Sequence, residues 1–313
     1  MGYRSSDPFG LKDAIWYVFG PTSALLNVTE YALASSSTPA KGVTHRFLKF
    51  LWRPWTTVWL SVPAKYRFWT YQALERIGEK LYDMRPGSAK RLPFGLYLKF
   101  GPVEGLRSEA LATMFVASNT TIPVPTVLDF VEHPRGAAMI MTCLPGTSVS
   151  HAIHSGELPR EEFEATMQDW LSQLRGLPTP SHDIVASFDG SKCMCHRVLD
   201  TRFGPFPNIA AFHEFLFSGL EHLREVTEKS YSKPHRICFT HGDIHMQNIL
   251  FYDGKLSGLV DWECAGWYPE YWEYIVAIYH TKKLPYWVDS FGNIFPQYAD
   301  ELAAEREYWK LPW

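Results

Sequence analysis

The sequence contains few cysteines. Five of its 313 residues are Cys, which is an odd count and too few for the disulfide scaffold of a secreted chain. The segment Cys193-Met194-Cys195-His196 has no second pair of ligands at a recognisable spacing, so it does not predict a zinc site. Reduced thiols are therefore expected, and they are typical of a cytoplasmic protein.

Long apolar runs are also absent. A membrane-spanning helix needs roughly 18–20 uncharged apolar residues, and charged residues interrupt the most apolar stretch, residues 47–62. Residues 1–64 have two features of peripheral membrane proteins: an N-myristoylation pattern at Met1-Gly2, and a mixture of cations and rings over residues 46–53. The favoured interpretation of this N-terminal extension is an ordinary helix packed on the body of the protein.

Neither sign of charge dominates the sequence. Thirty Lys and Arg residues stand against 33 Asp and Glu residues, which gives a net charge of −3 at pH 7. Without a basic excess, the sequence predicts no nucleic-acid partner. Charged residues at 20% and hydrophobic residues at 46% are ordinary globular values, which excludes a disordered chain and leaves room for one large domain or two lobes.

Hydrophobic periodicity divides the rest of the chain into two parts. Residues 65–146 mix short strands with helical spacing of apolar residues, whereas residues 147–313 have mainly helical periodicity. The exception in the second part is a pair of apolar runs, 249–251 and 256–260, which the turn signal Asp253-Gly254 joins into a β-hairpin. The sequence thus predicts an α+β fold with a small β-rich lobe and a larger helical lobe that contains the hairpin.

The expected elements follow from the same periodicity. Helices are predicted over residues 68–81, 106–115, 163–174 and 212–223, and strands over residues 95–100, 124–130 and 138–142. We expect the hairpin to be the one β insert among the helices of the second part.

The most informative residues flank the predicted hairpin. The loop before it contains a carboxylate at Asp243 and a carboxamide at Asn248, and a second carboxylate follows it at Asp261. Because the hairpin folds the chain back on itself, Asn248 and Asp261 are expected to lie close together, with Asp243 one loop away.

Phosphoryl transfer needs such a trio. Its loose transition state spreads negative charge, so catalysis depends on positioning and charge neutralisation. A carboxylate and an amide oxygen hold Mg²⁺ against a triphosphate, and a separate carboxylate orients the attacking hydroxyl and accepts its proton. The protein-kinase pattern H-R-D-x-x-x-x-N, followed by a metal-binding Asp, has the same spacing, with Gly242 here in place of the arginine.

These residues resemble the aminoglycoside phosphotransferase and choline kinase superfamily. The resemblance rests on His241-Gly242-Asp243-Ile244-His245 with Asn248 and on Asp261-Trp262-Glu263-Cys264-Ala265-Gly266, and residues 267–274 are most similar to its fungal members. It covers about residues 80–280 and implies a bilobal protein-kinase-like fold, with ATP as phosphoryl donor and Mg²⁺ as metal. Too few residues lie between Asp261 and Pro269-Glu270 to form the activation segment of a protein kinase, which together with Gly242 argues against protein substrates.

The resemblance implies a role for each residue of the trio. Asp243 would be the catalytic aspartate, and Asn248 and Asp261 would be the metal ligands. His241 would support the catalytic loop, and His245 is expected to be structural.

The implied nucleotide site lies in the first lobe. By resemblance, Lys99 would hold the α- and β-phosphates, Glu109 would orient Lys99, and Thr142 and Cys143 would face adenine in the hinge, mainly through backbone groups. Taken alone, Lys99 could be a solvated charge, and an exposed helix residue is the favoured interpretation of Glu109. The order of the two residues relative to the trio favours the functional interpretation of the pair. Glycine is scarce over residues 83–95, so the loop over the triphosphate is poorly defined.

The acceptor region implied by the resemblance follows Asp261. The chain has 12 Trp, 16 Tyr and 20 Phe residues. In this region Glu263, Glu270 and Glu273 are interleaved with the aromatic residues Trp262, Trp267, Tyr268, Tyr271, Trp272 and Tyr274. Carboxylates among aromatic faces suit an amine-bearing alcohol, through ion pairing and cation–π contact. The alternative, that most of these rings form the core of the helical lobe, stays open.

Two other functions are weighed against a small-molecule kinase. A metal-dependent phosphohydrolase could use His241, Asp243 and His245, but it needs further Asp and His ligands that the sequence does not supply. A non-catalytic kinase-like scaffold is compatible with the poorly defined phosphate loop, although every catalytic position is filled. The sequence therefore predicts an ATP- and Mg²⁺-dependent O-phosphotransferase that acts on a small-molecule hydroxyl.

Overall fold

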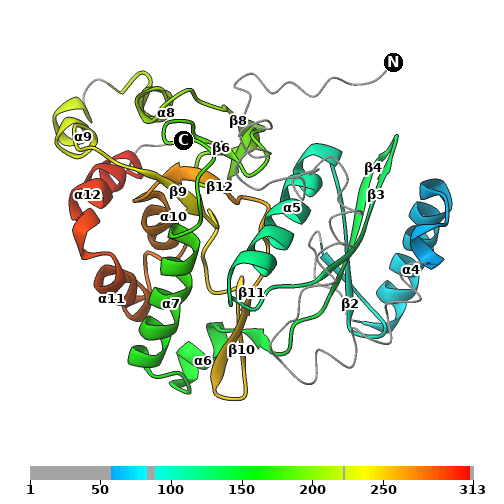
Figure 1. Ribbon diagram of the computed structural model, residues 1–313. Helices are drawn as coiled ribbons and strands as arrows, with labels where there is room; N and C mark the ends of the chain where they lie inside the picture. Colours follow the sequence, from blue (N-terminus) through cyan, green and yellow to red (C-terminus); the bar gives the residue numbers. More distant parts are fainter. Residues whose placement is uncertain (1–57, 83–88, 221–222, 311–313) are drawn as a thin grey trace.

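The chain folds into two lobes that lie side by side (Figure 1). A computed structural model describes residues 58–82, 89–220 and 223–310. The predicted N-myristoylation pattern, the segment 46–53 and residues 83–88 of the glycine-poor segment lie outside the described residues. The α+β bilobal fold predicted from the sequence is confirmed.

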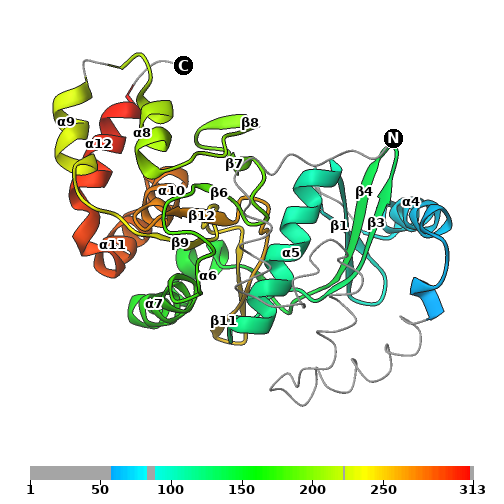
Figure 2. The same cartoon turned by 45° about the horizontal axis from the view of Figure 1, so that its top comes forward.

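The first lobe is a four-stranded antiparallel sheet between two helices. The strand order is β1-β2-β4-β3. Helix α5 lies on the side of the sheet that faces the second lobe and helix α4 on the outer side, as two views agree (Figures 1 and 2). The elements are α4 (Ala64–Leu81), β1 (Ala89–Leu92), β2 (Leu96–Gly101), α5 (Val103–Asn119), β3 (Val127–His133) and β4 (Gly136–Thr142).

The alternation of side chains across this sheet decides which residues face the second lobe. Leu98 and Ile140 are paired across β2 and β4 and pack in the small core under α4. The next pair, Lys99 and Met139, points to the opposite face. Met139 packs in the main core there, and Lys99 is directed toward α5.

The second lobe is mainly helical, and its core is rich in aromatic side chains. Fully buried rings include Trp262, Trp267, Trp272 and Trp287. None of the helices in the described residues has the length and apolar composition to cross a membrane. The helices are α6 (Ser150–Ser155), α7 (Arg160–Arg175), α8 (Ile209–Phe217), α9 (Arg224–Tyr231), α10 (Trp272–His280), α11 (Pro285–Ile294) and α12 (Ala299–Tyr308), with a 3₁₀ turn at Pro296–Tyr298.

The predicted hairpin is confirmed, but it is not the only β structure of this lobe. It consists of β10 (Ile249–Tyr252) and β11 (Lys255–Leu259), and β5 (Thr147–Ser148) pairs with β10. The expectation of one β insert is wrong, because two more small sheets are present. One sheet has three strands in the order β6-β12-β9: β6 (Ala186–Ser187), β12 (Gly266–Pro269) and β9 (Ile237–Thr240). The other sheet pairs β7 (Cys193–Cys195) with β8 (Leu199–Phe203).

Burial explains why β9 and β12 escaped prediction. Every residue of β9 and β12 is buried, so neither strand alternates between polar and apolar residues.

The predicted helix over residues 212–223 is also wrong in its second half. Helix α8 ends at Phe217 because the chain turns at Gly219, whose φ is 78°.

Candidate active site

The loop between β9 and β10 carries the predicted catalytic residues, and His241 fixes its shape. The ring Nδ1 of His241 accepts the backbone N–H of Asp243 at 3.2 Å, so Nε2 carries the proton and donates to the carbonyl of Val260 at 3.0 Å. Burial lowers the pKa of His241 to about 4, which keeps the ring neutral at neutral pH. His241 therefore ties the catalytic loop to the chain that follows β11.

Gly242 is required by the conformation of this loop. Its φ is 77°, in the left-handed region, and a Cβ atom there would lie 2.5 Å from the carbonyl oxygen of Cys264. Gly242, which stands where the protein-kinase pattern has an arginine, thus has no room for any side chain.

Replacing Gly242 tests this crowding. Gly242→Ala is expected to destabilise the protein by about 3 kcal/mol or more, because the left-handed backbone and the collision both add to the cost. Gly254→Ala is the matched control, since Gly254 also has a φ of 77° but no atom lies within 4 Å of its Cβ position; about 1 kcal/mol is expected there. Equal losses in urea unfolding would show that crowding at the catalytic loop is absent.

Glu273 anchors the backbone of the same loop. Its carboxylate accepts the backbone N–H of His241 at 2.6 Å and that of Gly242 at 3.0 Å. Burial raises the pKa of Glu273 to about 7, against the two N–H groups, which favour the charged form. The sequence placed Glu273 among the carboxylates of the acceptor region, but the structure places it beneath the catalytic loop, at the start of α10.

Asp243 is held from two sides. Asn248 donates from Nδ2 to the Oδ2 and the backbone carbonyl of Asp243, at 2.8 and 2.9 Å. The Nε2 atoms of His245 and His280 lie 3.4 Å from Oδ2 and 3.2 Å from Oδ1, respectively. Burial alone would raise the pKa of Asp243, but the hydrogen bonds of the two histidines outweigh it and hold that pKa below its ordinary value. His280, the last residue of α10, was missed by the sequence analysis.

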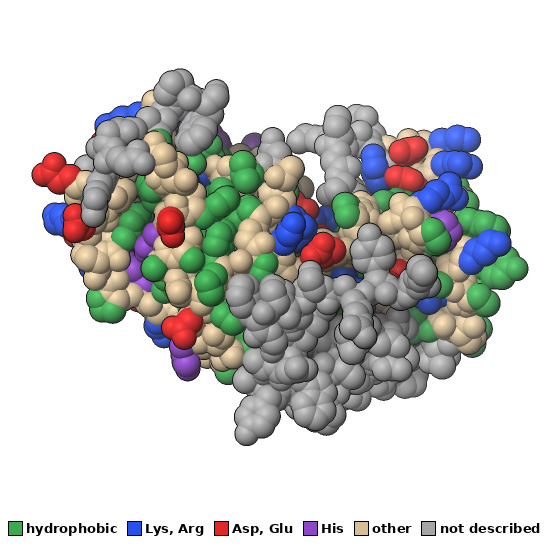
Figure 3. All heavy atoms as spheres, turned by 90° about the horizontal axis from the view of Figure 1, so that it is seen from above, with side chains coloured by type: hydrophobic (Ala, Val, Ile, Leu, Met, Phe, Trp, Pro, Cys, Tyr) green, Lys and Arg blue, Asp and Glu red, His purple; other side chains and the backbone are tan. Residues whose placement is uncertain are grey.

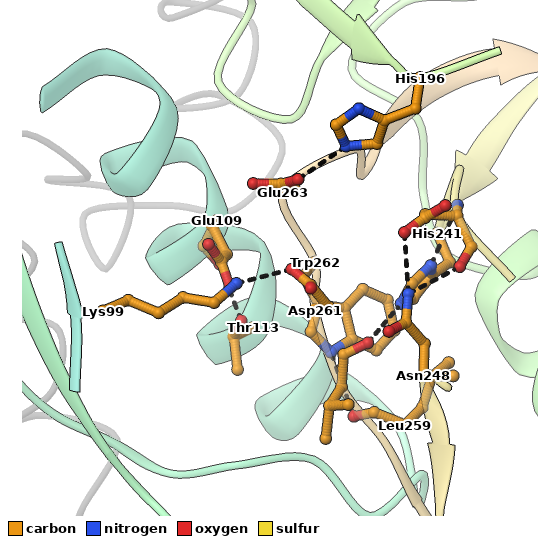
Figure 4. Close-up of polar contacts among 12 residues, drawn as sticks. Lys99, Glu109, Thr113, His196, His241, Asn248, Leu259, Asp261, Trp262 and Glu263 are labelled. Atoms are coloured by element: carbon orange, nitrogen blue, oxygen red, sulfur yellow. Dashed lines mark hydrogen bonds and ion pairs between the residues drawn. The ribbon is translucent and has the colours of Figure 1, made fainter. Parts of the chain in front are cut away.

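Lys99 joins the two lobes (Figure 4). Its Nζ lies 2.7 Å from Glu109 Oε1 on α5 and 2.6 Å from Asp261 Oδ1 after β11. Burial alone would lower the pKa of Lys99, but the two carboxylates outweigh it and raise that pKa above its ordinary value. Lys99 and Glu109 are each 3% exposed, so they are not a solvated charge and an exposed helix residue. Acidic and basic side chains also adjoin on the surface between the lobes, seen from above (Figure 3).

The hairpin carries Asn248 and Asp261 to neighbouring positions. The backbone N–H of Val260 donates to the carbonyl of Asn248 at 2.9 Å. Asp261 has a φ of 68°, which residues other than glycine rarely adopt and which is enriched at functional sites. Oxygen atoms of Glu109, Asp261 and Glu263 lie within 4.8 Å of one another, so carboxylates are concentrated around Asp261.

The predicted hinge offers fewer donors than expected. The backbone N–H of Cys143 donates to the carbonyl of Gly95 at 2.7 Å, and that of Thr142 donates to the carbonyl of Thr126 at 2.9 Å. Both groups are therefore engaged inside the first lobe. An adenine ring that docks here would have to use other backbone groups of the hinge.

Only one of the three candidate acceptor residues lies at the site. Glu263 accepts a hydrogen bond from Nε2 of His196 at 2.9 Å, which gives His196 of the cysteine-rich segment a place beside the catalytic groups. Trp267 is 1% exposed and donates from Nε1 to the carbonyl of Phe188 at 3.2 Å. Its ring belongs to the core of the second lobe, as do most of the rings that were weighed as pocket walls: Trp262, Tyr268, Tyr271, Trp272 and Tyr274.

Glu270 has cationic partners away from the catalytic loop. Its Oε2 lies 3.1 Å from Arg175 Nη2 and 3.0 Å from Arg236 Nε. The structure therefore does not bring Glu270 together with Asp243 or Asp261.

An open groove adjoins the catalytic loop. It has a volume of about 650 Å³ and is lined by hydroxyl, imidazole and amide groups, with Gln247 next to Asn248. Ser148 Oγ, in its wall, donates to the carbonyl of Met246 at 2.7 Å. The lining residues are Thr147, Ser148, Ser150, His151, His154 and Gln247.

Comparison with known sequences gives one family. The sequence model of the phosphotransferase enzyme family, APH, matches residues 98–308. This range contains the whole cluster from Lys99 to His280 and begins after α4 and β1. No curated protein gives a match.

Several solved structures are similar at low identity. Aminoglycoside phosphotransferase APH(4)-Ia, in a ternary complex with ADP and hygromycin B, is 14% identical, with 71% of this chain and 81% of that chain covered and a TM-score of 0.47. Macrolide 2'-phosphotransferase MphH from Brachybacterium faecium is 14% identical, with 70% and 78% covered and a TM-score of 0.44. APH(2")-IIa, in a ternary complex with streptomycin and ATP, is 14% identical, with 76% and 86% covered and a TM-score of 0.48.

Proposed function

The chain belongs to the phosphotransferase enzyme family, and we propose that it transfers the γ-phosphoryl group of ATP to a hydroxyl group of a small molecule, with Mg²⁺ as the metal. The observation that carries this proposal is the contact of Lys99 with both Glu109 and Asp261. In phosphoryl transfer, a cation and a metal-binding carboxylate must act on the same triphosphate.

The side chains of Asn248 and Asp261 fit a magnesium ion. Both donors of the Asn248 amide group are directed to Asp243, which leaves the amide oxygen to serve as a ligand. Asp261 supplies a carboxylate oxygen, and hard oxygen ligands are those that Mg²⁺ prefers. When bound there, Mg²⁺ supplies charge neutralisation for the phosphates.

Lys99, Glu109 and Asp243 have separate roles in the proposed transfer. Lys99 holds the α- and β-phosphates, and Glu109 orients Lys99. Asp243 orients the acceptor hydroxyl, whose oxygen forms a bond to the γ-phosphorus while the bond from that phosphorus to the β–γ bridging oxygen breaks. The electron pair of that bond leaves with ADP, and the hydroxyl proton passes to Asp243.

The acceptor that the sequence favours is an amine-bearing alcohol. Glu263 is 33% exposed in its side chain, lies among the catalytic carboxylates and would attract a cationic group. Trp267 and Glu270 give no support to this acceptor, because one is core and the other is paired with arginines. The amine preference therefore depends on Glu263 alone.

The hydrogen bonds of His241 argue against a metal-dependent phosphohydrolase. Both ring nitrogens of His241 are engaged by the backbone, so this histidine is not available as a metal ligand. The scaffold alternative predicts nucleotide binding without turnover, and the engaged hinge donors are compatible with it. Measured binding and turnover therefore decide between scaffold and kinase.

The nucleotide site is tested first by thermal unfolding. A ligand at 100 times its Kd adds about 2.7 kcal/mol of stability, which corresponds to several degrees in Tm for a protein of this size. We expect millimolar ATP to raise Tm only when Mg²⁺ is present, and Asp261→Ala to abolish the rise.

The matched control is Asp183→Ala, because Asp183 is exposed and should keep the full Mg²⁺-dependent rise in Tm. The absence of any rise in the wild-type chain would contradict the proposed nucleotide site. A rise that persists in Asp261→Ala would contradict the role of Asp261 as metal ligand.

A further inference from the structure

Helix α10 contacts the catalytic loop at two points. Glu273, in its first turn, holds the backbone of His241 and Gly242, and His280, at its end, reaches the carboxylate of Asp243. The two residues are seven positions apart, which is two helical turns, so they project from the same face about 10 Å apart along the axis. One face of one helix thus fixes both the backbone and the side chain of the loop.

The contacts of Asp243 are unequal at its two oxygens. Oδ2 is near both Asn248 Nδ2 and His245 Nε2, at 2.8 and 3.4 Å, whereas Oδ1 has His280 Nε2 at 3.2 Å. A carboxylate oxygen accepts two hydrogen bonds. Among the residues that the structure describes, Oδ1 therefore keeps one acceptor site, and this is the site that can receive the hydroxyl of a substrate.

The protonation of His245 follows from its second ring nitrogen. Nδ1 of His245 accepts the backbone N–H of Gln247 at 3.2 Å, so the neutral ring carries its proton on Nε2, which lies 3.4 Å from Oδ2 of Asp243. His245 and Asn248 together fix Oδ2. They restrain rotation about the Cβ–Cγ bond of Asp243 from the side of Oδ2, and Nε2 of His280, 3.2 Å from Oδ1, restrains the same rotation from the other side.

We propose that His280 is a positioning residue for phosphoryl transfer: its Nε2–H holds Oδ1 of Asp243 so that the second acceptor site of that oxygen faces the acceptor hydroxyl. The side chain of His280 is 23% exposed, so it borders the open side of the catalytic carboxylate. This inference rests on the proposed function, because it assigns an orientation to the same base.

The kinetic effect follows from the geometry. Without His280, the carboxylate of Asp243 is held at Oδ2 alone, so Oδ1 is oriented less strictly, and a displacement of about 1 Å can cost on the order of 100-fold in rate. We expect His280→Ala to lower kcat by about 10- to 100-fold and to leave the KM for ATP unchanged. His280→Gln places an amide N–H near the position of Nε2 and should restore most of kcat.

The assay uses water as the acceptor, as slow Mg²⁺-dependent release of ADP from ATP, together with ethanolamine and choline as amine-bearing alcohols. His182→Ala is the matched control, because His182 is exposed and should leave kcat unchanged. A His280→Ala variant with the kcat of the wild type would overturn the positioning role. Equal losses in His280→Ala and His280→Gln would overturn it too, because the role requires only the N–H group.

A second readout does not depend on turnover. Long-range ¹⁵N NMR of the histidine rings at pH 8 should show the Nε2–H tautomer for His280, with signals that shift in Asp243→Asn. An Nδ1–H tautomer, or signals insensitive to Asp243→Asn, would overturn the contact itself. If the contact is present but the wild-type chain releases no ADP and phosphorylates no acceptor, the proposed function fails and the positioning role fails with it.

Discussion

Asp243→Asn is expected to bind Mg²⁺–ATP normally and to lose turnover by about 10²- to 10⁴-fold, the contribution of a positioned general base. Asparagine has the same shape, so the loop held by His241 and Glu273 should keep its conformation. A carboxamide cannot take up the proton of the hydroxyl. The measurements are steady-state ADP release for kcat and calorimetric titration for the Kd of ATP.

The matched control changes the same side chain at a distance from the site. Asp253→Asn lies in the exposed turn of the hairpin, where asparagine also tolerates the φ of 51°, and it should leave both kcat and Kd unchanged. Normal turnover in Asp243→Asn would remove Asp243 as the base. Loss of ATP binding in the same variant would instead point to a collapsed loop, which unfolding measurements on the variant would reveal.

The hairpin shows what the sequence can predict. Two apolar runs around Asp253-Gly254 specify a tight turn, and a tight turn places Asn248 and Asp261 at neighbouring ends of two strands. The structure has this hairpin. Local turn chemistry was sufficient there, because no residue from another element is needed to close the hairpin.

The environment of Lys99 could not be predicted without the tertiary structure. Strand alternation gives the two faces of β2, but only the position of α5 decides that one face carries a buried ion pair with Glu109 rather than a solvated cation. The burial of both side chains excludes the two alternatives that the sequence left open.

Glu273 and His280 could not be predicted from pattern. Residues 272–278 of α10 are all buried, so the helix lacks the polar face from which a functional residue would stand out. In the sequence, aromatic residues flank Glu273, and this composition is typical both of an acceptor pocket and of a core that contains a buried carboxylate. One physical argument could have predicted the role of Glu273. Burying a carboxylate without partners costs free energy, so a buried Glu273 must have hydrogen-bond donors nearby.

Lys99→Met is expected to be the most destabilising change at the site. Removing one partner of a buried ion pair leaves an uncompensated charge and costs about 3–5 kcal/mol. The pair with Glu109 carries most of this cost, since both side chains are 4% exposed, whereas the side chain of Asp261 is 32% exposed and screened by water. Urea unfolding measures the loss. Lys90→Met is the control, because its Nζ lies 3.8 Å from Glu79 at the surface and its loss should stay within about 0.5 kcal/mol.

The double variant Lys99→Met/Glu109→Gln separates stability from activity. Replacing both members of a buried pair removes the uncompensated charge, so the double variant should be more stable than Lys99→Met alone. Turnover should not return, because neither methionine nor glutamine offers a cation to the α- and β-phosphates. Recovery of both stability and turnover would assign Lys99 a purely structural role. Recovery of stability alone is the expected result, since the charge of Lys99 serves the fold through Glu109 and the reaction through the phosphates.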